Sequence, residues 1–186
     1  MDERNARRTG DECLVAGVDA VTDVQCERAA DIVLVLDQST SIVAHDPDYD
    51  NWYVHLLGFA KSVAGAFPIG REKTQVGVMK FNQGVDTVFH LDDYGNRESL
   101  LGAIGSLDIG GGDTNIAGAL RHAREQMFSR FNGARSDVPK ILILITDGTA
   151  NVEESNTLRE AALTKATNIK IFTVGVTDEA SGEASK

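Results

Sequence analysis

Residues 31–41 read Asp-Ile-Val-Leu-Val-Leu-Asp-Gln-Ser-Thr-Ser. The five consecutive apolar residues at 32–36 are typical of a short strand that is buried on both faces, as in a parallel sheet. Asp37 then stands at the carboxyl end of that strand, which is where open α/β sheets bind their ligands. Asp37, Ser39 and Ser41 offer one carboxylate and two hydroxyls, and oxygen ligands are those that Mg²⁺ and Ca²⁺ prefer. The stretch therefore predicts a central strand that ends at a divalent-metal site.

Strands and helices are predicted to alternate along the rest of the chain. Further strands are expected at 75–81, 140–146 and 170–176, and helices at 52–67, 97–107, 116–128 and about 153–167. Residues 85–91 alternate apolar with more polar positions after the tight connection 82–84, which predicts an antiparallel hairpin. The order predicts an α/β fold: a doubly wound, mostly parallel sheet with one antiparallel edge strand and helices on both faces.

Two further segments bring oxygen groups to the same edge of this sheet. The apolar strand 140–146 ends at Asp147, and the glycines at 110–112 lead into Thr114, which is well placed as the N-cap of the following helix. Loops at the strand ends of a doubly wound sheet converge on one crevice. The predicted metal ligands are Asp37, Ser39, Ser41, Thr114 and Asp147. Because two carboxylates and three hydroxyls are a weakly anionic set, we expect water, or a carboxylate from a partner, to complete the coordination of the metal.

Composition and charge restrict the partners and the domain organisation. The 186 residues carry a net charge of −10, so no basic footprint supports nucleic-acid binding. No apolar run is long enough to cross a membrane, and the charged start of the chain lacks the apolar segment of a signal peptide. We expect an extension or linker at 1–29, one domain at 30–178 and a polar tail at 179–186. The chain is then either intracellular or an internal piece of a longer secreted protein.

The two cysteines, Cys13 and Cys26, both lie before the first predicted strand. They can pair with each other, form a disulfide with a segment outside this chain, or remain free thiols. Two cysteines do not make a structural zinc site, which needs about four ligands.

Three motifs in order resemble the metal-ion-dependent adhesion site of von Willebrand factor A domains. They are Asp37-x-Ser39-x-Ser41, Gly-Gly-Asp-Thr-Asn at 111–115 and Ile-Thr-Asp-Gly at 145–148. Further matches, such as Phe-Pro-Ile-Gly at 67–70 and Thr-Gln-Val-Gly-Val at 74–78, are similar to the A domains of matrilins and non-fibrillar collagens. The resemblance covers about residues 30–177.

The resemblance implies a Rossmann-like A-domain fold and a role in extracellular adhesion or matrix assembly. It also implies that Ser39, Ser41 and Thr114 approach the metal directly, whereas Asp37 and Asp147 act partly through water. Such domains normally continue after position 176 with another helix, an edge strand and a terminal helix, so this chain is expected to be truncated at its C-terminus. No insertion after Asp147 resembles the extra helix of collagen-binding integrin domains, so collagen is not specifically implied.

The leading hypothesis is a binding module of a secreted matrix or cell-surface protein that uses Mg²⁺, or Mn²⁺ or Ca²⁺, to coordinate a Glu or Asp of its partner. An alternative is a structural matrix-assembly domain whose metal site is not used to capture a ligand. We do not expect an enzyme, because position 39 is serine where haloacid-type phosphatases have a second aspartate, and the phosphate-loop and nucleophile-elbow motifs are missing. An intracellular A domain of the chelatase-assembly kind is a fourth interpretation.

The acidic loop at 46–50 carries Asp46, Asp48 and Asp50 at alternate positions. These carboxylates suit either a solvated loop or a second calcium site. The sequence favours the solvated loop, because no glycine turn and no distal glutamate complete a calcium-binding loop.

Overall fold

A computed structural model describes residues 29–44, 48–148 and 150–176. Its core is a five-stranded sheet of order β3-β2-β1-β4-β5. The strands are β1 (Asp31–Asp37), β2 (Gln75–Phe81), β3 (Val85–Phe89), β4 (Lys140–Thr146) and β5 (Ile169–Gly175). β1 pairs in parallel with β2 and β4, β4 pairs in parallel with β5, and β3 pairs antiparallel with β2 at one edge. The predicted sheet, with its single antiparallel edge strand, is confirmed.

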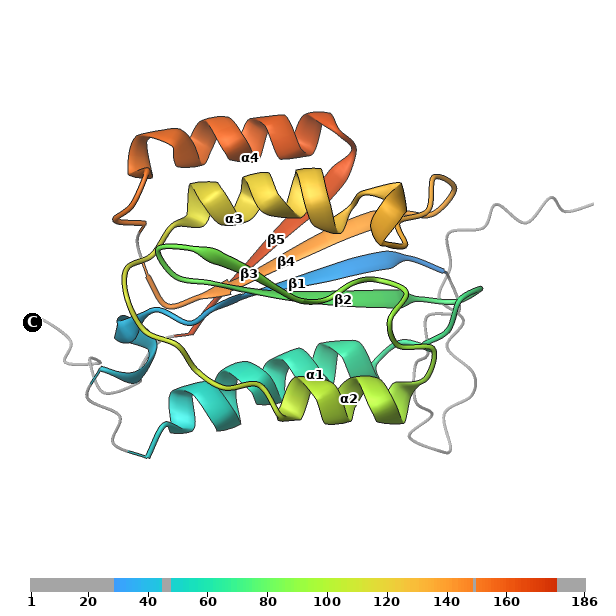
Figure 1. The fold of residues 1–186 in the computed structure, drawn as a ribbon, viewed down its shortest axis with the longest axis horizontal. Helices are drawn as coiled ribbons and strands as arrows, with labels where there is room; N and C mark the ends of the chain where they lie inside the picture. Colours follow the sequence, from blue (N-terminus) through green and yellow to red (C-terminus); the bar gives the residue numbers. More distant parts are fainter. Residues whose placement is uncertain (1–28, 45–47, 149, 177–186) are drawn as a thin grey trace, which may run out of the picture.

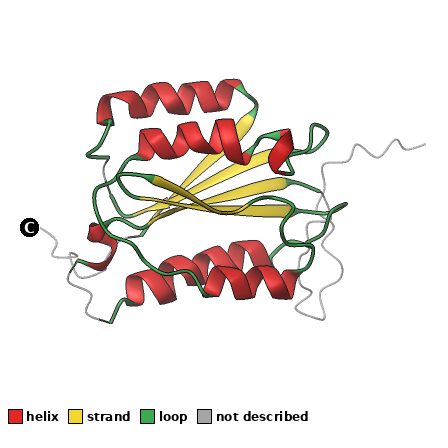
Figure 2. Ribbon diagram, in the orientation of Figure 1, coloured by secondary structure: helices red, strands yellow, loops and turns green. Residues whose placement is uncertain are grey.

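Helices cover both faces of the sheet, as predicted (Figure 1). One face carries α1 (Leu57–Gly65) and α2 (Arg97–Gly105), and the other carries α3 (Ile116–His122) and α4 (Thr157–Ala166). The loops between these layers are seen in Figure 2. In the described part of the chain, none of these helices is long and apolar enough to cross a bilayer.

β1 lies at the centre of the fold, and all seven of its residues are buried. Successive side chains of a strand point to opposite faces of the sheet. Ile32, Leu34 and Leu36 therefore join the core beneath α1 and α2, whereas Val33 and Val35 join the core beneath α3. Burial of each such aliphatic side chain stabilises the fold by about 1.5–3 kcal/mol. The continuous apolar run thus becomes a strand with a hydrophobic core on each side.

The first predicted helix differs in detail from the one observed. It starts as a π-helical segment (Asn51–Leu56) and continues as α1. A π-helical segment makes i→i+5 hydrogen bonds and so changes which side chains face the sheet. In α1, Leu57 is fully buried, whereas Phe59 is 37% exposed. Trp52, near the start of the π-helical segment, is fully buried and donates its indole N–H to the carbonyl of Leu107 at 3.1 Å.

The edge hairpin is shorter than predicted, because β3 ends at Phe89 rather than at residue 91. The next two N–H groups turn away from the sheet. His90 donates to the Asp93 carboxylate at 2.8 Å, and Leu91 donates to the carbonyl of Asn132 at 3.3 Å. Hydrogen bonds to groups outside the sheet therefore replace the ladder at residues 90 and 91.

The carboxyl ends of the parallel strands lie at one end of the molecule, on the left in Figure 1. The segments that follow β1 and β4 emerge there, and the connection from α2 to α3 passes the same end (Figure 1). This arrangement brings together the three sequence motifs that carry the predicted metal ligands.

Candidate metal centre

Asp37, the last residue of β1, has no exposed surface. Its Oδ1 accepts a hydrogen bond from the backbone N–H of Ser39 at 2.9 Å, and its Oδ2 accepts one from the Thr146 hydroxyl at 2.5 Å. Thr146 is the last residue of β4, and its Oγ1 also accepts from the N–H of Gly148 at 3.2 Å. The ends of the two central strands therefore fix the orientation of this carboxylate.

Ser39, Ser41 and Asp147 form a chain of side-chain oxygens beside Asp37. The hydroxyl oxygens of Ser39 and Ser41 are 3.0 Å apart, and the Ser41 hydroxyl donates to Oδ1 of Asp147 at 3.0 Å. Ser41 reaches this position because a short 3₁₀ turn (Thr40–Val43) follows β1 directly. Ser39 is buried and Ser41 is exposed. The oxygens therefore run from the protein interior to the surface, and the site is open on one side.

The Gly110–Gly112 segment is held against the turn after β1 by a reciprocal pair of hydrogen bonds. The N–H of Thr40 donates to the carbonyl of Gly112 at 3.0 Å, and the N–H of Gly112 donates to the Thr40 hydroxyl at 2.8 Å. Gly112 has φ +107°, and a Cβ there would collide with the Gln83 side chain. The backbone conformation of residue 112 therefore favours glycine, and a Cβ there would require the end of the Gln83 side chain to shift.

Thr114 follows this segment and is buried, with 4% of its surface exposed. Its predicted role as the N-cap of α3 is wrong, because Asn115 fills that position and its Oδ1 accepts from the N–H of Gly118 at 2.7 Å. The Thr114 hydroxyl is therefore not used to cap α3. Within the described residues, that hydroxyl makes no hydrogen bond to the other four predicted ligands. The structure thus connects Asp37, Ser39, Ser41 and Asp147 directly or through Thr146, and brings Thr114 near them only through its backbone segment.

The donor set fits a hard divalent cation. All five predicted groups are carboxylate or hydroxyl oxygens, which are ligands suited to Mg²⁺, Mn²⁺ or Ca²⁺. Among the described residues, no group of three or more His, Cys, Asp or Glu side chains is arranged to hold a metal. A cation at this edge of the sheet would therefore depend on the hydroxyls of Ser39, Ser41 and Thr114 as well as on two carboxylates.

Several polar residues of the site lay outside the predicted ligand set. Thr40 and Thr146 fall inside the quoted motifs. Their position between predicted ligands was a sequence signal that they belong to the site. Asn82 donates from its side chain to the carbonyl of Gly111 at 2.7 Å, and Asn151 accepts the N–H of Thr114 at 2.7 Å. These two asparagines act across 29 and 37 positions of sequence, and nothing in their local sequence indicates it.

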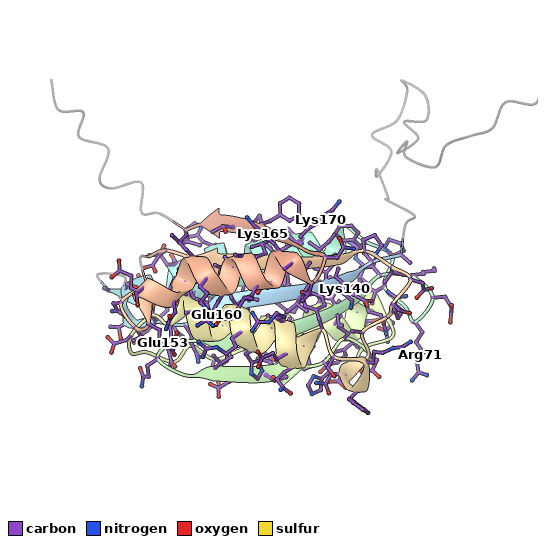
Figure 3. The ribbon with its side chains drawn as sticks, turned by 90° about the horizontal axis from the view of Figure 1, so that it is seen from above. Arg71, Lys140, Glu153, Glu160, Lys165 and Lys170 are labelled. Carbon is purple, nitrogen blue, oxygen red and sulfur yellow. The ribbon has the colours of Figure 1, made fainter. Side chains whose placement is uncertain are left out.

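An ion-pair network supports the wall of the site on the side of α3 and α4. Arg121 pairs with Glu153 at 2.8 Å and with Glu160 at 3.3 Å, and Arg124 pairs with Glu160 at 2.8 Å. Figure 3 places Glu153 and Glu160 along the junction of the two helices. The hydrogen bond from Arg124 is the main reason that the pKa of the Glu160 carboxyl lies below its ordinary value. Glu153 also accepts from the Asn115 side chain at 3.3 Å, so the network extends to the residue that follows Thr114.

Cys13, Cys26 and Asp46 lie outside the described residues. The pairing of the cysteines therefore stays a prediction. The described carboxylates of the acidic loop, Asp48 and Asp50, are exposed.

A doubly wound sheet with an oxygen-lined candidate site at the carboxyl ends of its central strands defines the class of protein, an α/β domain of the Rossmann-like type. The model of the von Willebrand factor type A domain family matches residues 31–186, and the chain belongs to that family. The predicted resemblance is confirmed.

Relatives of this chain include adhesion and matrix proteins. It is 32% identical over 155 residues to the transmembrane cell adhesion receptor mua-3 of Caenorhabditis elegans, which covers 82% of this chain and 4% of the receptor. It is 34% identical over 148 residues to the collagen alpha-1(XX) chain of Mus musculus, which covers 79% of this chain and 10% of the collagen chain. This chain therefore corresponds to a small part of either relative.

A solved structure of proximal thread matrix protein 1 (PTMP1) from the mussel byssus is similar in fold and sequence. Its TM-score is 0.75 at 33% identity, covering 81% of this chain and 39% of PTMP1, and it has zinc in the metal-ion-dependent adhesion site motif. Homologous A domains thus hold a divalent metal at the motif that this chain shares.

Proposed function

We propose that this domain is a non-enzymatic, divalent-metal-dependent protein-binding module. The metal is held by Asp37, Ser39, Ser41, Thr114 and Asp147, and Mg²⁺ is the expected ion, with Mn²⁺ or Ca²⁺ as alternatives. The observation that carries the proposal is the continuous chain of oxygens from Ser39 through Ser41 to Asp147, beside the buried carboxylate of Asp37.

The charge of the site supports recognition of an acidic group. A bound divalent ion supplies a Lewis-acidic position that favours oxygen anions. Two carboxylates formally balance its charge, and hydroxyls add none, so the ion stays more electrophilic than in a site with three or four carboxylates. Ser41 and Asp147 lie at the more exposed end of the set. We therefore propose that a Glu or Asp of the partner completes the coordination from that side.

We also propose that the partner is an extracellular matrix or cell-surface protein and that this domain acts outside the cell. The support is the similarity to mua-3, to a collagen chain and to PTMP1. The net charge of −10 agrees with the partner class, because a strongly acidic domain does not favour nucleic acid or an anionic membrane surface.

The first experiment measures metal binding directly. Titration with Mn²⁺, followed by electron paramagnetic resonance of the free ion, is expected to show one bound ion per chain. Ser39→Ala is expected to weaken binding strongly, because it removes a proposed ligand. Ser62→Ala is the matched control: Ser62 is an exposed serine of α1 whose hydroxyl donates to the carbonyl of Gly58, and the variant should bind as the wild type does.

The second experiment tests the carboxylate of the partner. Binding of the domain to immobilised matrix proteins is measured with Mg²⁺, with chelator, and after the carboxyl groups of the matrix proteins have been converted to amides. Binding is expected only with metal and with unmodified carboxylates. Binding that persists in chelator and in Ser39→Ala would contradict the proposal and favour a structural matrix-assembly domain whose metal site captures no ligand.

A further inference from the structure

Asn151 holds the backbone of Thr114 from both sides. Its Oδ1 accepts the N–H of Thr114 at 2.7 Å, and its own N–H donates to the carbonyl of Thr114 at 3.1 Å. The N–H of Val152 donates to the same carbonyl at 3.2 Å, and Nδ2 of Asn151 donates to Asp113 at 3.4 Å. Both backbone groups of Thr114 are thus bonded to a segment that is 37 positions away in sequence.

The same segment carries Asp147 at its start, only four positions before Asn151. Between them, Ala150 is buried in the core beneath α3. Just after Asn151, Glu153 accepts from the Asn115 side chain and pairs with Arg121. The loop that follows β4 is therefore anchored on both sides of Asn151, so that Asn151 can act as a fixed support for Thr114.

The Thr114 side chain contrasts with its backbone. Asn115 rather than Thr114 caps α3, and the Thr114 hydroxyl is not bonded to the other predicted ligands within the described part of the chain. The backbone bonds to Asn151 and Val152 therefore fix the position of the main chain from which that hydroxyl projects.

We propose that Asn151 is a positioning residue that fixes Thr114 for metal binding and couples the Thr114 loop to the Asp147 loop. This inference rests on the proposed function, because it assigns Asn151 a role at the same metal site. In the described part of the chain, the Asn151 side chain accepts from the backbone N–H of Thr114 and donates to Asp113, which is not a predicted metal ligand. Its contribution to metal affinity should therefore depend on the Thr114 hydroxyl.

A double-mutant cycle tests this dependence. Mn²⁺ affinity is measured for the wild type, Asn151→Ala, Thr114→Ala and the double variant. Loss of one net hydrogen bond predicts that Asn151→Ala weakens Mn²⁺ binding about three- to tenfold. In the Thr114→Ala background the same substitution is expected to have little further effect, because the group that it positions has been removed.

Amide exchange provides a readout that needs no metal. In the metal-free protein, exchange of the Thr114 N–H is expected to accelerate in Asn151→Ala and to stay slow in Asn151→Asp, which retains an acceptor oxygen. Asn156→Ala is the matched control, since Asn156 is a nearby asparagine whose side chain donates to Glu153 at 3.4 Å. It should change neither the exchange of Thr114 nor the affinity for Mn²⁺.

The outcomes separate this inference from the proposed function. Suppose that the wild type binds Mn²⁺, but that Asn151→Ala weakens binding equally in the wild type and in Thr114→Ala, or has no effect. That result would overturn the positioning role alone. Unchanged exchange of the Thr114 N–H in Asn151→Ala would also overturn it. A folded wild type that binds no Mn²⁺ would refute the proposed function and, with it, the role of Asn151 at the metal site.

Discussion

Two buried aspartates bracket β1, and replacing each by asparagine should separate metal binding from fold stability. Asp31 and Asp37 are both fully buried, at opposite ends of the strand. At about 3.3 Å per residue, their backbones lie about 20 Å apart. Asp31 pairs with Arg135 at 2.7 Å, whereas Asp37 is a predicted metal ligand. We expect Asp37→Asn to abolish stabilisation by metal and Asp31→Asn to leave it intact.

The expected magnitude for Asp37→Asn follows from its two hydrogen bonds. An asparagine can still accept from the N–H of Ser39 and can donate to the Thr146 hydroxyl, so the metal-free protein should change by less than about 1 kcal/mol. A ligand at one hundred times its Kd stabilises the folded state by about 2.7 kcal/mol. For a chain of this size that corresponds to a rise in Tm of about 5–11 °C. The wild type should show this rise, and Asp37→Asn should not.

The control substitutions have different signatures. Asp37→Ala leaves the Ser39 N–H and the Thr146 hydroxyl without their acceptor, so it should destabilise the metal-free protein by about 1–3 kcal/mol for each group. Asp31→Asn weakens a buried ion pair and should lower metal-free stability by up to about 3 kcal/mol, with the metal-induced rise unchanged. Thermal unfolding followed by circular dichroism, with Mg²⁺ and with chelator, measures all four proteins. A full metal-induced rise in Asp37→Asn would refute the reasoning.

Three further predictions concern the scaffold around the site. Trp52→Phe removes the indole N–H that donates to the carbonyl of Leu107 and leaves a cavity, so we expect the free energy of unfolding to fall by about 2–4 kcal/mol. Urea unfolding followed by circular dichroism measures it, because the variant has no tryptophan left for fluorescence. Glu160→Gln weakens the bond to Arg124 and should lower stability at pH 7 by about 1–3 kcal/mol. Since the pKa of Glu160 is lowered in the folded state, with the hydrogen bond from Arg124 as the main cause, this difference should shrink as the pH falls below about 4.5. Burial lowers the pKa of His122 from its ordinary value of 6.5, so the unfolded chain takes up the proton more readily. The free energy of unfolding should therefore fall as the pH drops through about 6.5. Urea unfolding at pH 7.5 and 5.5 should show a smaller pH dependence for His122→Gln than for the wild type.

The central fold was predictable because its strongest signals are local. The uninterrupted apolar runs of β1 and β4 need burial on both faces, and only a central position in a sheet with helices on both sides provides it. Each run ends in an aspartate, and parallel strands necessarily bring those ends to one edge. The proximity of Asp37 to the Ser41–Asp147 pair therefore follows from topology, without any knowledge of side-chain contacts.

The details that sequence reasoning missed depend on tertiary contacts. Thr114 and Asn115 are adjacent and both can cap a helix, so local sequence does not decide which of them does so. In the structure Asn115 caps α3, and Asn151 holds the backbone of Thr114. Likewise, hydrophobic spacing alone reveals neither the π-helical segment before α1 nor the partial exposure of Phe59. Long-range hydrogen bonds and local changes of helix type decide which residue caps a helix and which side chains are buried. Hydrophobic period and helix propensity do not determine these details.

The hydrogen bonds between the loops of the site should link metal affinity to partner binding. Asp37 is buried and already bonded on both oxygens, and Ser39 is buried as well, so the protein itself holds the inner half of the site in place. The outer half, Ser41 and Asp147, lies on two different loops, and the Ser41 hydroxyl donates to Asp147. The Thr114 loop is tied to the Asp147 loop through Asn151. A ligand that displaces Asp147 from Ser41 must therefore also act on the segment that holds Thr114. Partner binding and metal affinity should for this reason be linked through the loop after β4, and each should strengthen the other by the same factor.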